Sequence, residues 1–312
     1  MGHVGSKSNL NPNNNNRSSR KSSSSISKKH SFRYANGRRF HNDENSMYFL
    51  PNDEEEVDRL QLEHFLFRYI WEDNFSSPIR DLIDKGDAKL LDVGCGPGTW
   101  LLDMSTDFPR SSFTGVDMSP IYPGDIKPRN LTFHTANVLE GLPFSDNTFD
   151  FVYMRFLMTA FTEDDWQNKV IKELIRVCKP GGWIEIMEGD LVFNPEGPAG
   201  KRLMDAYRST LESKQINPKI INHLQSILSS TETLSCLTTK EKSGPIGTWA
   251  GRIGELSYQN FSQTLRALKP VLCKLMECAG EEYDELMEEF GRECNSNNTN
   301  FVHFRFFAKK VE

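Results

Sequence analysis

The sequence predicts an α/β fold in which a doubly wound, mostly parallel sheet carries helices on both faces. Three observations support this prediction. Between residues 89 and 188, short apolar segments alternate with amphipathic ones, as in consecutive βα units. A glycine-rich turn at 94–98 separates the first apolar segment from an amphipathic one. Residues 301–307 alternate as a strand does, so the chain ends in a further strand.

The beginning of the chain differs from the rest. Residues 1–45 are rich in Ser, Asn and basic side chains and poor in apolar ones, so we expect a disordered tail followed by one folded domain over 46–312. Order is expected to begin near Tyr48. Glu54 to Glu56 suit the start of a helix, which apolar residues at helical spacing extend to about Trp71.

The remaining elements follow in order. Strands are expected at 89–94, 113–117, 131–135, 149–154, 183–188 and 301–308, and helices at about 99–107 and 163–178. Residues 198–230 are predicted to be helical up to a break at Pro218. A further helical stretch covers 252–292, interrupted near Pro270 and Gly280.

Charge and composition exclude several classes of protein. No apolar run reaches the roughly 18–20 residues that a membrane helix requires. Residues 1–42 hold nine Lys and Arg and no acid, which leaves 28 basic and 43 acidic residues in the rest of the chain. An acidic body repels nucleic acid. The six cysteines form no C-x-x-C pair and no apolar signal peptide precedes them, which indicates an intracellular protein without a metal site.

The turn after the first strand carries the strongest signal, in the run Leu90-Leu91-Asp92-Val93-Gly94-Cys95-Gly96-Pro97-Gly98-Thr99. Glycines there let the backbone approach a ligand closely. Nicotinamide enzymes use a similar turn. However, Asp92 directly before the turn, and Thr99 in place of a third Gly or Ala, disfavour the pyrophosphate cradle of those enzymes.

Four further elements follow the glycine turn. Asp117 ends the next strand, where a carboxylate can accept hydrogen bonds from two ribose hydroxyls, with Met118 beside it to pack an adenine face. Asn137 and Val138 form a turn that can pair the adenine edge. The last two elements are the strand Phe149-Asp150-Phe151-Val152-Tyr153-Met154-Arg155 and the turn and strand Cys178-Lys179-Pro180-Gly181-Gly182-Trp183-Ile184-Glu185-Ile186.

These five elements, in this order, resemble the class I S-adenosylmethionine-dependent methyltransferases over residues 89–188. The preceding run Tyr48-Phe49-Leu50-Pro51-Asn52-Asp53, with Asp58-Arg59-Leu60, His64 and Asn74-Phe75-Ser76-Ser77-Pro78-Ile79, is similar to the fungal methyltransferases related to regulators of secondary metabolism. Two positions depart from that pattern, Glu63 in place of Gln and Asn137 in place of Asp. The resemblance implies a seven-stranded Rossmann-like sheet whose last strand is antiparallel.

The resemblance also implies S-adenosyl-L-methionine as cofactor and assigns roles to residues. The methionine part would be admitted by Gly94, Cys95, Gly96 and Gly98, and its ammonium would be held by Asp92. Asp117 would bind ribose, and the adenine slot would be formed by Met118, Asn137 and Val138. The channel toward the substrate would be lined by Tyr153, Met154 and Arg155. Methyl transfer is an in-line displacement in which the cofactor carries the reactivity, so no universal catalytic residue is expected.

Three residues are weak candidates for a general base. Glu188 and Asp190 lie just beyond the carboxyl end of a strand, where ligands gather in such sheets, and His64 lies on the N-terminal helix. The N-terminal segment at 48–75 and a helical insertion at about 198–230 are expected to cover the site. The acceptor of the methyl group cannot be read from the sequence. A regulatory protein that binds the cofactor without turnover is the alternative.

The N-terminal tail allows several interpretations. Met1 to Ser6 fit the pattern for N-myristoylation at Gly2, and the basic residues that follow could add weak membrane association. The cluster from Arg17 to Lys29 fits a nuclear address equally well, and Ser22 to Ser25 fit a kinase target. We expect a cytoplasmic location, with the nucleus or a membrane surface as alternatives.

Overall fold

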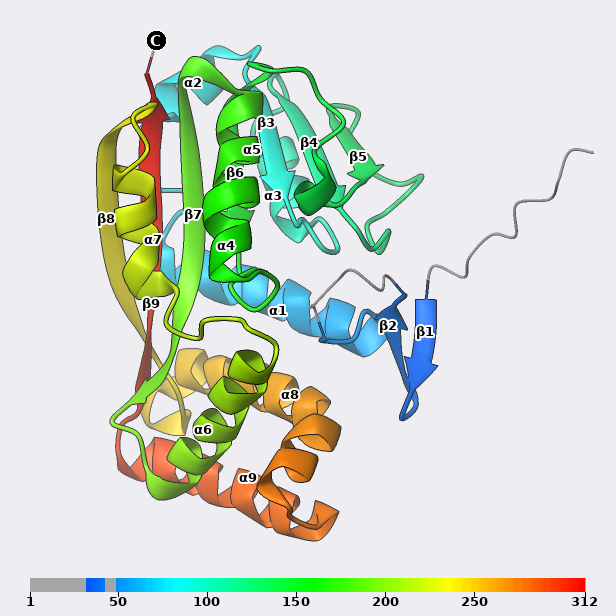
Figure 1. The fold of residues 1–312 in the computed structure, drawn as a ribbon, viewed down its shortest axis with the longest axis vertical. Helices are drawn as coiled ribbons and strands as arrows, with labels where there is room; N and C mark the ends of the chain where they lie inside the picture. Colours follow the sequence, from blue (N-terminus) through cyan, green and yellow to red (C-terminus); the bar gives the residue numbers. More distant parts are fainter. Residues whose placement is uncertain (1–31, 43–48, 312) are drawn as a thin grey trace, which may run out of the picture. The chain divides into compact units, whose positions relative to one another are not determined.

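The central sheet of the computed structural model, which describes residues 32–42 and 49–311, has the predicted topology (Figure 1). Within that part of the chain, seven strands form one sheet in the order β5-β4-β3-β6-β7-β9-β8. The first five in this order run parallel, and β9 is antiparallel to both of its neighbours. The strands are β3 (Lys89–Val93), β4 (Ser112–Asp117), β5 (Leu131–Thr135), β6 (Phe149–Arg155), β7 (Cys178–Asn194), β8 (Leu234–Pro245) and β9 (Asn300–Lys310).

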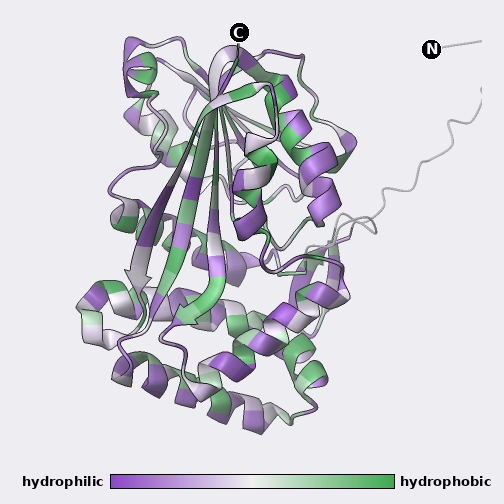
Figure 2. Cartoon of the chain, turned by 60° about the vertical axis from the view of Figure 1, so that its left-hand side comes forward, coloured by the Kyte–Doolittle hydropathy of each residue, from purple (hydrophilic) through white to green (hydrophobic). Residues whose placement is uncertain are grey.

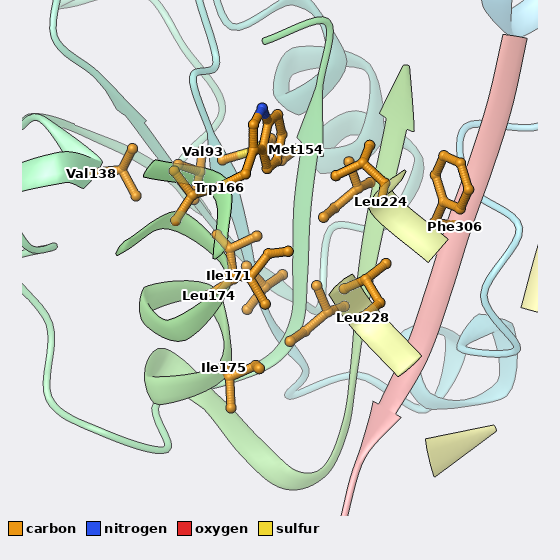
Figure 3. Packing of buried hydrophobic residues seen from close by; sticks show 14 of the residues in the cluster. Val93, Val138, Met154, Trp166, Ile171, Leu174, Ile175, Leu224, Leu228 and Phe306 are labelled. Atoms are coloured by element: carbon orange, nitrogen blue, oxygen red, sulfur yellow. The ribbon is translucent and has the colours of Figure 1, made fainter. Parts of the chain in front are cut away.

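Helices cover both faces of the sheet because successive strand residues point to opposite sides. Leu90 packs with α2 (Arg80–Lys85) and α3 (Thr99–Asp107), whereas Leu91 belongs to the cluster on the other face. That second face is covered by α4 (Glu163–Asp165), a π-helical segment η2 (Trp166–Val170) and α5 (Ile171–Val177), and by α7 (Ile221–Ser229). Figure 3 shows Trp166, Leu174, Leu224 and Leu228 in this cluster.

A separate group of helices packs around a third apolar core, distinct from the clusters on the two faces of the sheet. It consists of α1 (Glu54–Trp71), α6 (Pro198–Ser213), α8 (Gly251–Met276) and α9 (Gly280–Ser296). Two short 3-10 turns lie in the connections: η1 (Val138–Glu140) follows β5, and η3 (Thr248–Ala250) directly precedes α8. In Figure 1 these four helices lie below β3, β4 and β5, at the end toward which β3 points, and the long strands β7 and β9 reach down beside them. Figure 2 shows apolar and polar residues interleaved along them, as expected of helices with one buried face.

Two predictions about helices need correction. The cover predicted at 198–230 comes from α6 together with α1, α8 and α9, since α7 packs on the sheet instead. Pro270 does not interrupt α8; buried Leu268 and Leu272 on either side hold the helix through the proline. The break lies at 277–279, before Gly280. β8 and α2 were not predicted, and β8 carries too few apolar residues to show a strand pattern.

The predicted tail also contains structure. Residues 32–41 form a hairpin of β1 (Phe32–Ala35) and β2 (Arg38–His41), so the prediction of disorder is wrong for this part. Asn36 and Gly37 both have positive φ, 50° and 74°, as a two-residue hairpin turn requires. The remaining tail features, including Gly2 and the cluster from Arg17 to Lys29, lie outside the described residues. No helix among the described residues is both long and apolar enough to cross a membrane.

Candidate active site

The glycine turn lies between the ends of β3 and β4. The backbone amides of Gly94 and Cys95 both donate to the carbonyl of Val116, at 2.8 and 3.0 Å, which ties the turn to β4. Gly94, Gly96 and Gly98 have φ of 73°, 54° and 74°, a region that L side chains rarely adopt. A Cβ on Gly94 would lie 2.3 Å from Leu157 Cδ1, so this close approach also requires glycine.

Asp117 connects the turn to the end of β4. Its Oδ2 accepts a hydrogen bond from the Gly96 amide at 2.8 Å and its Oδ1 accepts one from the Ser119 amide at 2.7 Å. Burial raises the pKa of Asp117, and these amide hydrogen bonds act in the opposite direction. The carboxylate is thereby held in one orientation at the edge of the site.

A cavity containing about 1150 Å³ of empty space opens at this edge of the sheet. It brings together eight of the residues predicted to bind the cofactor: Gly94, Cys95, Gly96, Asp117, Met118, Asn137, Val138 and Arg155. They come from four different loops that follow parallel strands, which is where such sheets bind ligands. The Asn137 Oδ1 also accepts from the Leu139 amide at 3.0 Å and caps η1, which fixes the side chain at the wall.

Four predicted cofactor residues do not line this cavity: Gly98, Tyr153, Met154 and Asp92, which is described below. Tyr153 and Met154 lie inside β6, which is buried on both faces, so their side chains fill the two cores. Tyr153 stacks on Trp100 with ring centroids 4.4 Å apart, and Figure 3 shows Met154 in the opposite core. Gly98 caps the start of α3, where a Cβ would lie 2.6 Å from the Phe133 ring. The side chains of Tyr153 and Met154 therefore fill the cores and not the cavity, and Gly98 is not part of its wall. Contact of these three residues with a cofactor or channel stays a prediction.

Asp92 lies buried beneath the turn, outside the cavity lining. Burial raises the pKa of Asp92 to about 7, with Arg155 acting to lower it. Among residues 32–42 and 49–311, neither Asp92 Oδ1 nor the Oγ1 of cavity-lining Thr99 has a hydrogen-bond partner. Buried acceptors are normally satisfied. Two unsatisfied oxygens next to the glycine turn therefore fit a ligand that carries hydrogen-bond donors, such as an ammonium group.

His64, the third candidate base, faces away from the cavity. Its ring is fully buried between α1 and α3, with Nε2 3.1 Å from Asp103 Oδ2. Burial lowers the pKa of His64 to about 4, despite the opposing hydrogen bond to Asp103. The contacts are those of a residue that packs α1 onto α3, so the interpretation of His64 as a base is wrong.

Residues before and on α1 complete the cavity; the sequence predicted that the segment 48–75 covers the site but assigned none of these residues to the cofactor. Asn52, Leu60 and Glu63 line its wall, and the Asn52 Nδ2 donates to the Ser119 hydroxyl at 3.4 Å. The signal was present, because Pro51-Asn52 and Leu60 belong to the runs that carried the resemblance. Residue 63 was singled out there only as a departure from the pattern.

A second cavity adjoins the first. It contains about 910 Å³ of empty space and shares Leu60, Glu63 and Phe156 with the cofactor cavity. We call it the inner chamber; its lining is Leu50, Arg59, Leu60, Glu63, Phe67, Phe156, Met158, Thr159, Glu188, Gly189, Asp190, Leu191, Phe193, Met204, Tyr207, Asn260, Phe261, Thr264, Leu265 and Phe301. Both remaining candidate bases, Glu188 and Asp190, therefore lie in one chamber next to the cofactor cavity.

The two acids differ in burial. Glu188 is fully buried, and its Oε1 accepts from the Leu157 amide at 2.8 Å. Burial raises the pKa of Glu188 to about 8, and hydrogen bonding from Leu157 opposes this. Asp190 is half-buried, and burial also raises its pKa. Across the described chain, no cluster of three or more His, Cys, Asp or Glu is placed to hold a metal ion.

Comparison with known proteins agrees with this geometry. Residues 90–182 match the family described as "Methyltransferase domain". The matched segment begins in β3, the strand before the glycine turn, and ends near the start of β7. These residues, which include β4, β5 and β6 of the sheet, are therefore similar to that family.

Individual relatives are fungal. The chain is 33% identical over 177 residues to the N-methyltransferase verN of Clonostachys rogersoniana, covering 55% of this chain and 60% of verN. It is 32% identical over 177 residues to the secondary metabolism regulator laeA of Aspergillus fumigatus, covering 55% of this chain and 45% of laeA. The matches thus span about half the length of these relatives. Among solved structures, Haemonchus contortus phosphoethanolamine N-methyltransferase 2 with S-adenosyl-L-methionine aligns at 18% identity and a TM-score of 0.46, covering 81% of this chain and 57% of that one.

Proposed function

We propose that the protein is an S-adenosylmethionine-dependent methyltransferase that transfers the methyl group to an acceptor seated in the inner chamber. The observation that carries the proposal is the cofactor cavity. Its wall combines a glycine turn with a fixed carboxylate at the end of the next strand, and two unsatisfied buried oxygens, of Thr99 in the wall and of Asp92 beneath the turn, lie beside it. Few ligands besides a nucleoside joined to an amino acid would use all three.

Each group has a task in this proposal. Asp117 accepts hydrogen bonds from ribose hydroxyls, and Met118 and Val138 hold the adenine ring. The oxygens of Asp92 and Thr99 receive the ammonium of the methionine part. When bound, the cofactor supplies a methyl carbon on a positively charged sulfur. The protein's own contribution is to align the acceptor and to exclude water from the sulfonium.

A regulatory protein without turnover is the second candidate, because relatives named as regulators of secondary metabolism match at 32% identity. The two candidates share the cofactor cavity and differ in the inner chamber. Binding of the cofactor product with no methyl transfer to any acceptor would favour the regulator. Transfer of labelled methyl from the cofactor to an acceptor would favour the enzyme.

Replacing Asp117 by Ala tests the cofactor assignment. Loss of two charge-assisted hydrogen bonds should weaken the binding of S-adenosylhomocysteine by about 2–4 kcal/mol. The matched control is Asp125→Ala, which removes an exposed acid from the loop that follows. Calorimetry on both folded variants measures the effect. Equal affinity of the Asp117 variant and the wild type would overturn the assignment.

A further inference from the structure

We propose that the inner chamber binds the methyl acceptor as a small, largely apolar molecule whose reacting N–H or O–H group donates a hydrogen bond to Glu188. This inference rests on the proposed function, since it names the class of acceptor for the same site. It starts from the walls of the chamber and from one buried carboxyl group.

The walls favour a small molecule with an apolar body. Six aromatic side chains line the chamber: Phe67, Phe156, Phe193, Tyr207, Phe261 and Phe301. They come from α1, β7, α6, α8, β9 and the loop after β6, so a ligand inside would be surrounded by separate elements. The rings of Phe67 and Phe156 lie 4.6 Å apart between centroids and form a continuous surface.

Glu188 is the polar group that this apolar surface leaves unsatisfied. Its side chain is 0% exposed, and within the described part of the chain its Oε2 has no hydrogen-bond partner. Oε1 is occupied by the Leu157 amide, which fixes the carboxyl group and leaves Oε2 for a ligand. A buried acceptor without a partner costs free energy that a donor on the ligand would recover.

The other charged groups of the chamber determine which ligand charge it can accept. Arg59 is held by carboxylates of its own helix, with Nη2 2.6 Å from Glu56 and Nη1 2.7 Å from Glu63. Its Nη1 also donates to Asn260 Oδ1 at 2.9 Å. The remaining titratable groups in the wall are Asp190 and Tyr207. Burial is the largest cause of the raised pKa of Glu188, and the nearby Glu63 carboxylate also raises this pKa. The chamber therefore suits hydrogen-bond donors and cations and disfavours carboxylates.

The reaction balances with Glu188 as the proton acceptor. The lone pair of the acceptor nitrogen or oxygen forms the new bond to the methyl carbon. The bond between sulfur and that carbon breaks, and its electron pair stays on sulfur, which becomes a neutral thioether. The proton of the N–H or O–H passes to Oε2 of ionised Glu188. Methyl transfer should therefore increase as the pH rises through about 8, where Glu188 loses its own proton.

Three probes with one aromatic body test the chamber: phenethylamine, 2-phenylethanol and phenylacetate. Each is titrated by ligand-observed NMR into protein saturated with S-adenosylhomocysteine. We expect the amine and the alcohol to bind with dissociation constants on the order of millimolar, as fragments of this size do, and phenylacetate to bind at least tenfold more weakly. Thr264→Trp, which fills the chamber from α8, should abolish binding of both, whereas Gln259→Trp on the exposed side of α8 should not.

The pH dependence assigns the carboxylate. Between pH 7 and 9 the amine stays cationic, because alkyl amines have a pKa of about 10.4. Glu188 ionises over the same range, so amine binding should tighten severalfold while alcohol binding changes little. Glu188→Gln should remove this tightening and Asp190→Asn should keep it. If Asp190→Asn removes it instead, Glu188 is not the recognition group.

The outcomes separate the two proposals. Failure of the wild type to bind S-adenosylhomocysteine overturns the proposed function and the inference with it. Normal binding of S-adenosylhomocysteine without binding of any probe, or with equal binding of phenylacetate, overturns the inference alone. Binding of the probes that survives Thr264→Trp also overturns it, since the probes would then occupy another surface. Persistence of the cofactor product's affinity in Thr264→Trp and Glu188→Gln shows that these variants fold.

Discussion

At the scale of single residues, the three glycines of the turn have different surroundings. Among the atoms of residues 32–42 and 49–311, a Cβ on Gly96 would have only Leu60 Cδ1, at 3.7 Å, within 4 Å. A Cβ on Gly98 would lie 2.6 Å from Cζ of the partly buried Phe133 ring, which packs against the core. Both positions have positive φ, so both substitutions strain the backbone. The difference between them is that Gly96 faces the cofactor cavity and Gly98 faces the core.

This difference predicts that two similar substitutions affect ligand binding and stability to different extents. Gly96→Ala should lower the free energy of unfolding by about 1–2 kcal/mol, the cost of the left-handed conformation, and weaken S-adenosylhomocysteine at least tenfold because the methyl group enters the cavity. Gly98→Ala should be destabilised more, by about 2–4 kcal/mol, since overpacking adds to the strain. Denaturant unfolding and calorimetry measure the two effects. A larger loss of stability in Gly96→Ala than in Gly98→Ala would contradict the assignment.

The predicted cofactor residues that line the cavity lie where a strand or turn ends. Gly94, Asp117 and Asn137 follow parallel strands, so their position at the site is set by topology alone. Strand interiors and helix faces need the packing as well. On α1 the reasoning chose His64, whereas Glu63 lines the cavity, because neighbours on a helix point about 100° apart. The face of α1 that meets the sheet depends on partners distant in sequence.

At the scale of elements, the hairpin of β1 and β2 holds the segment that enters α1. Arg38 pairs with Asp53 through Nε at 2.5 Å and Nη2 at 2.8 Å, and Asp53 caps α1 by accepting from the Glu56 amide at 3.2 Å. The Asn52 amide donates to the Arg39 carbonyl at 2.8 Å. Composition predicted disorder here because the segment buries few apolar groups. It is held instead by ion pairs and hydrogen bonds to α1.

The hairpin is therefore linked to the cofactor cavity through Asn52. The Arg39 guanidinium donates to the Asn52 side chain at 3.2 Å and to its carbonyl. Arg39→Ala should release Asn52 and weaken S-adenosylhomocysteine a few-fold, with a change in unfolding free energy within about 1 kcal/mol, as for exposed ion pairs. Arg33→Ala is the control, since Arg33 stacks on Phe40 within the hairpin. Equal affinities in the two variants would separate the hairpin from the site.

At the scale of the whole folded part, α1 joins the sheet to the helices below it. Its C-terminal half is anchored twice, by Arg68 and His64 on Asp103 of α3, and by Lys242 Nζ of β8, which donates to the Ile70 carbonyl at 2.9 Å. Its N-terminal half has Leu60 and Glu63 in the walls of both cavities. The cover over the site joins α1, which ends at Trp71, to α6 and α8, which begin at Pro198 and Gly251, a pairing that no local sequence pattern encodes.

This division of α1 predicts which backbone amides become more protected from hydrogen exchange when a ligand binds. Residues 49–60 should act as a lid whose backbone amides become more protected from hydrogen exchange when S-adenosylhomocysteine is added, together with those of 92–99. Amides at 64–71, already anchored to α3 and β8, should change little, and so should those of α9, which does not line either cavity. Exchange measured by mass spectrometry with and without saturating ligand gives the comparison. Protection at 92–99 with unchanged exchange at 49–60 would leave the cofactor cavity assigned and remove the lid. Uniform protection across α1 and α9 would instead indicate global stabilisation by ligand, without a local closure.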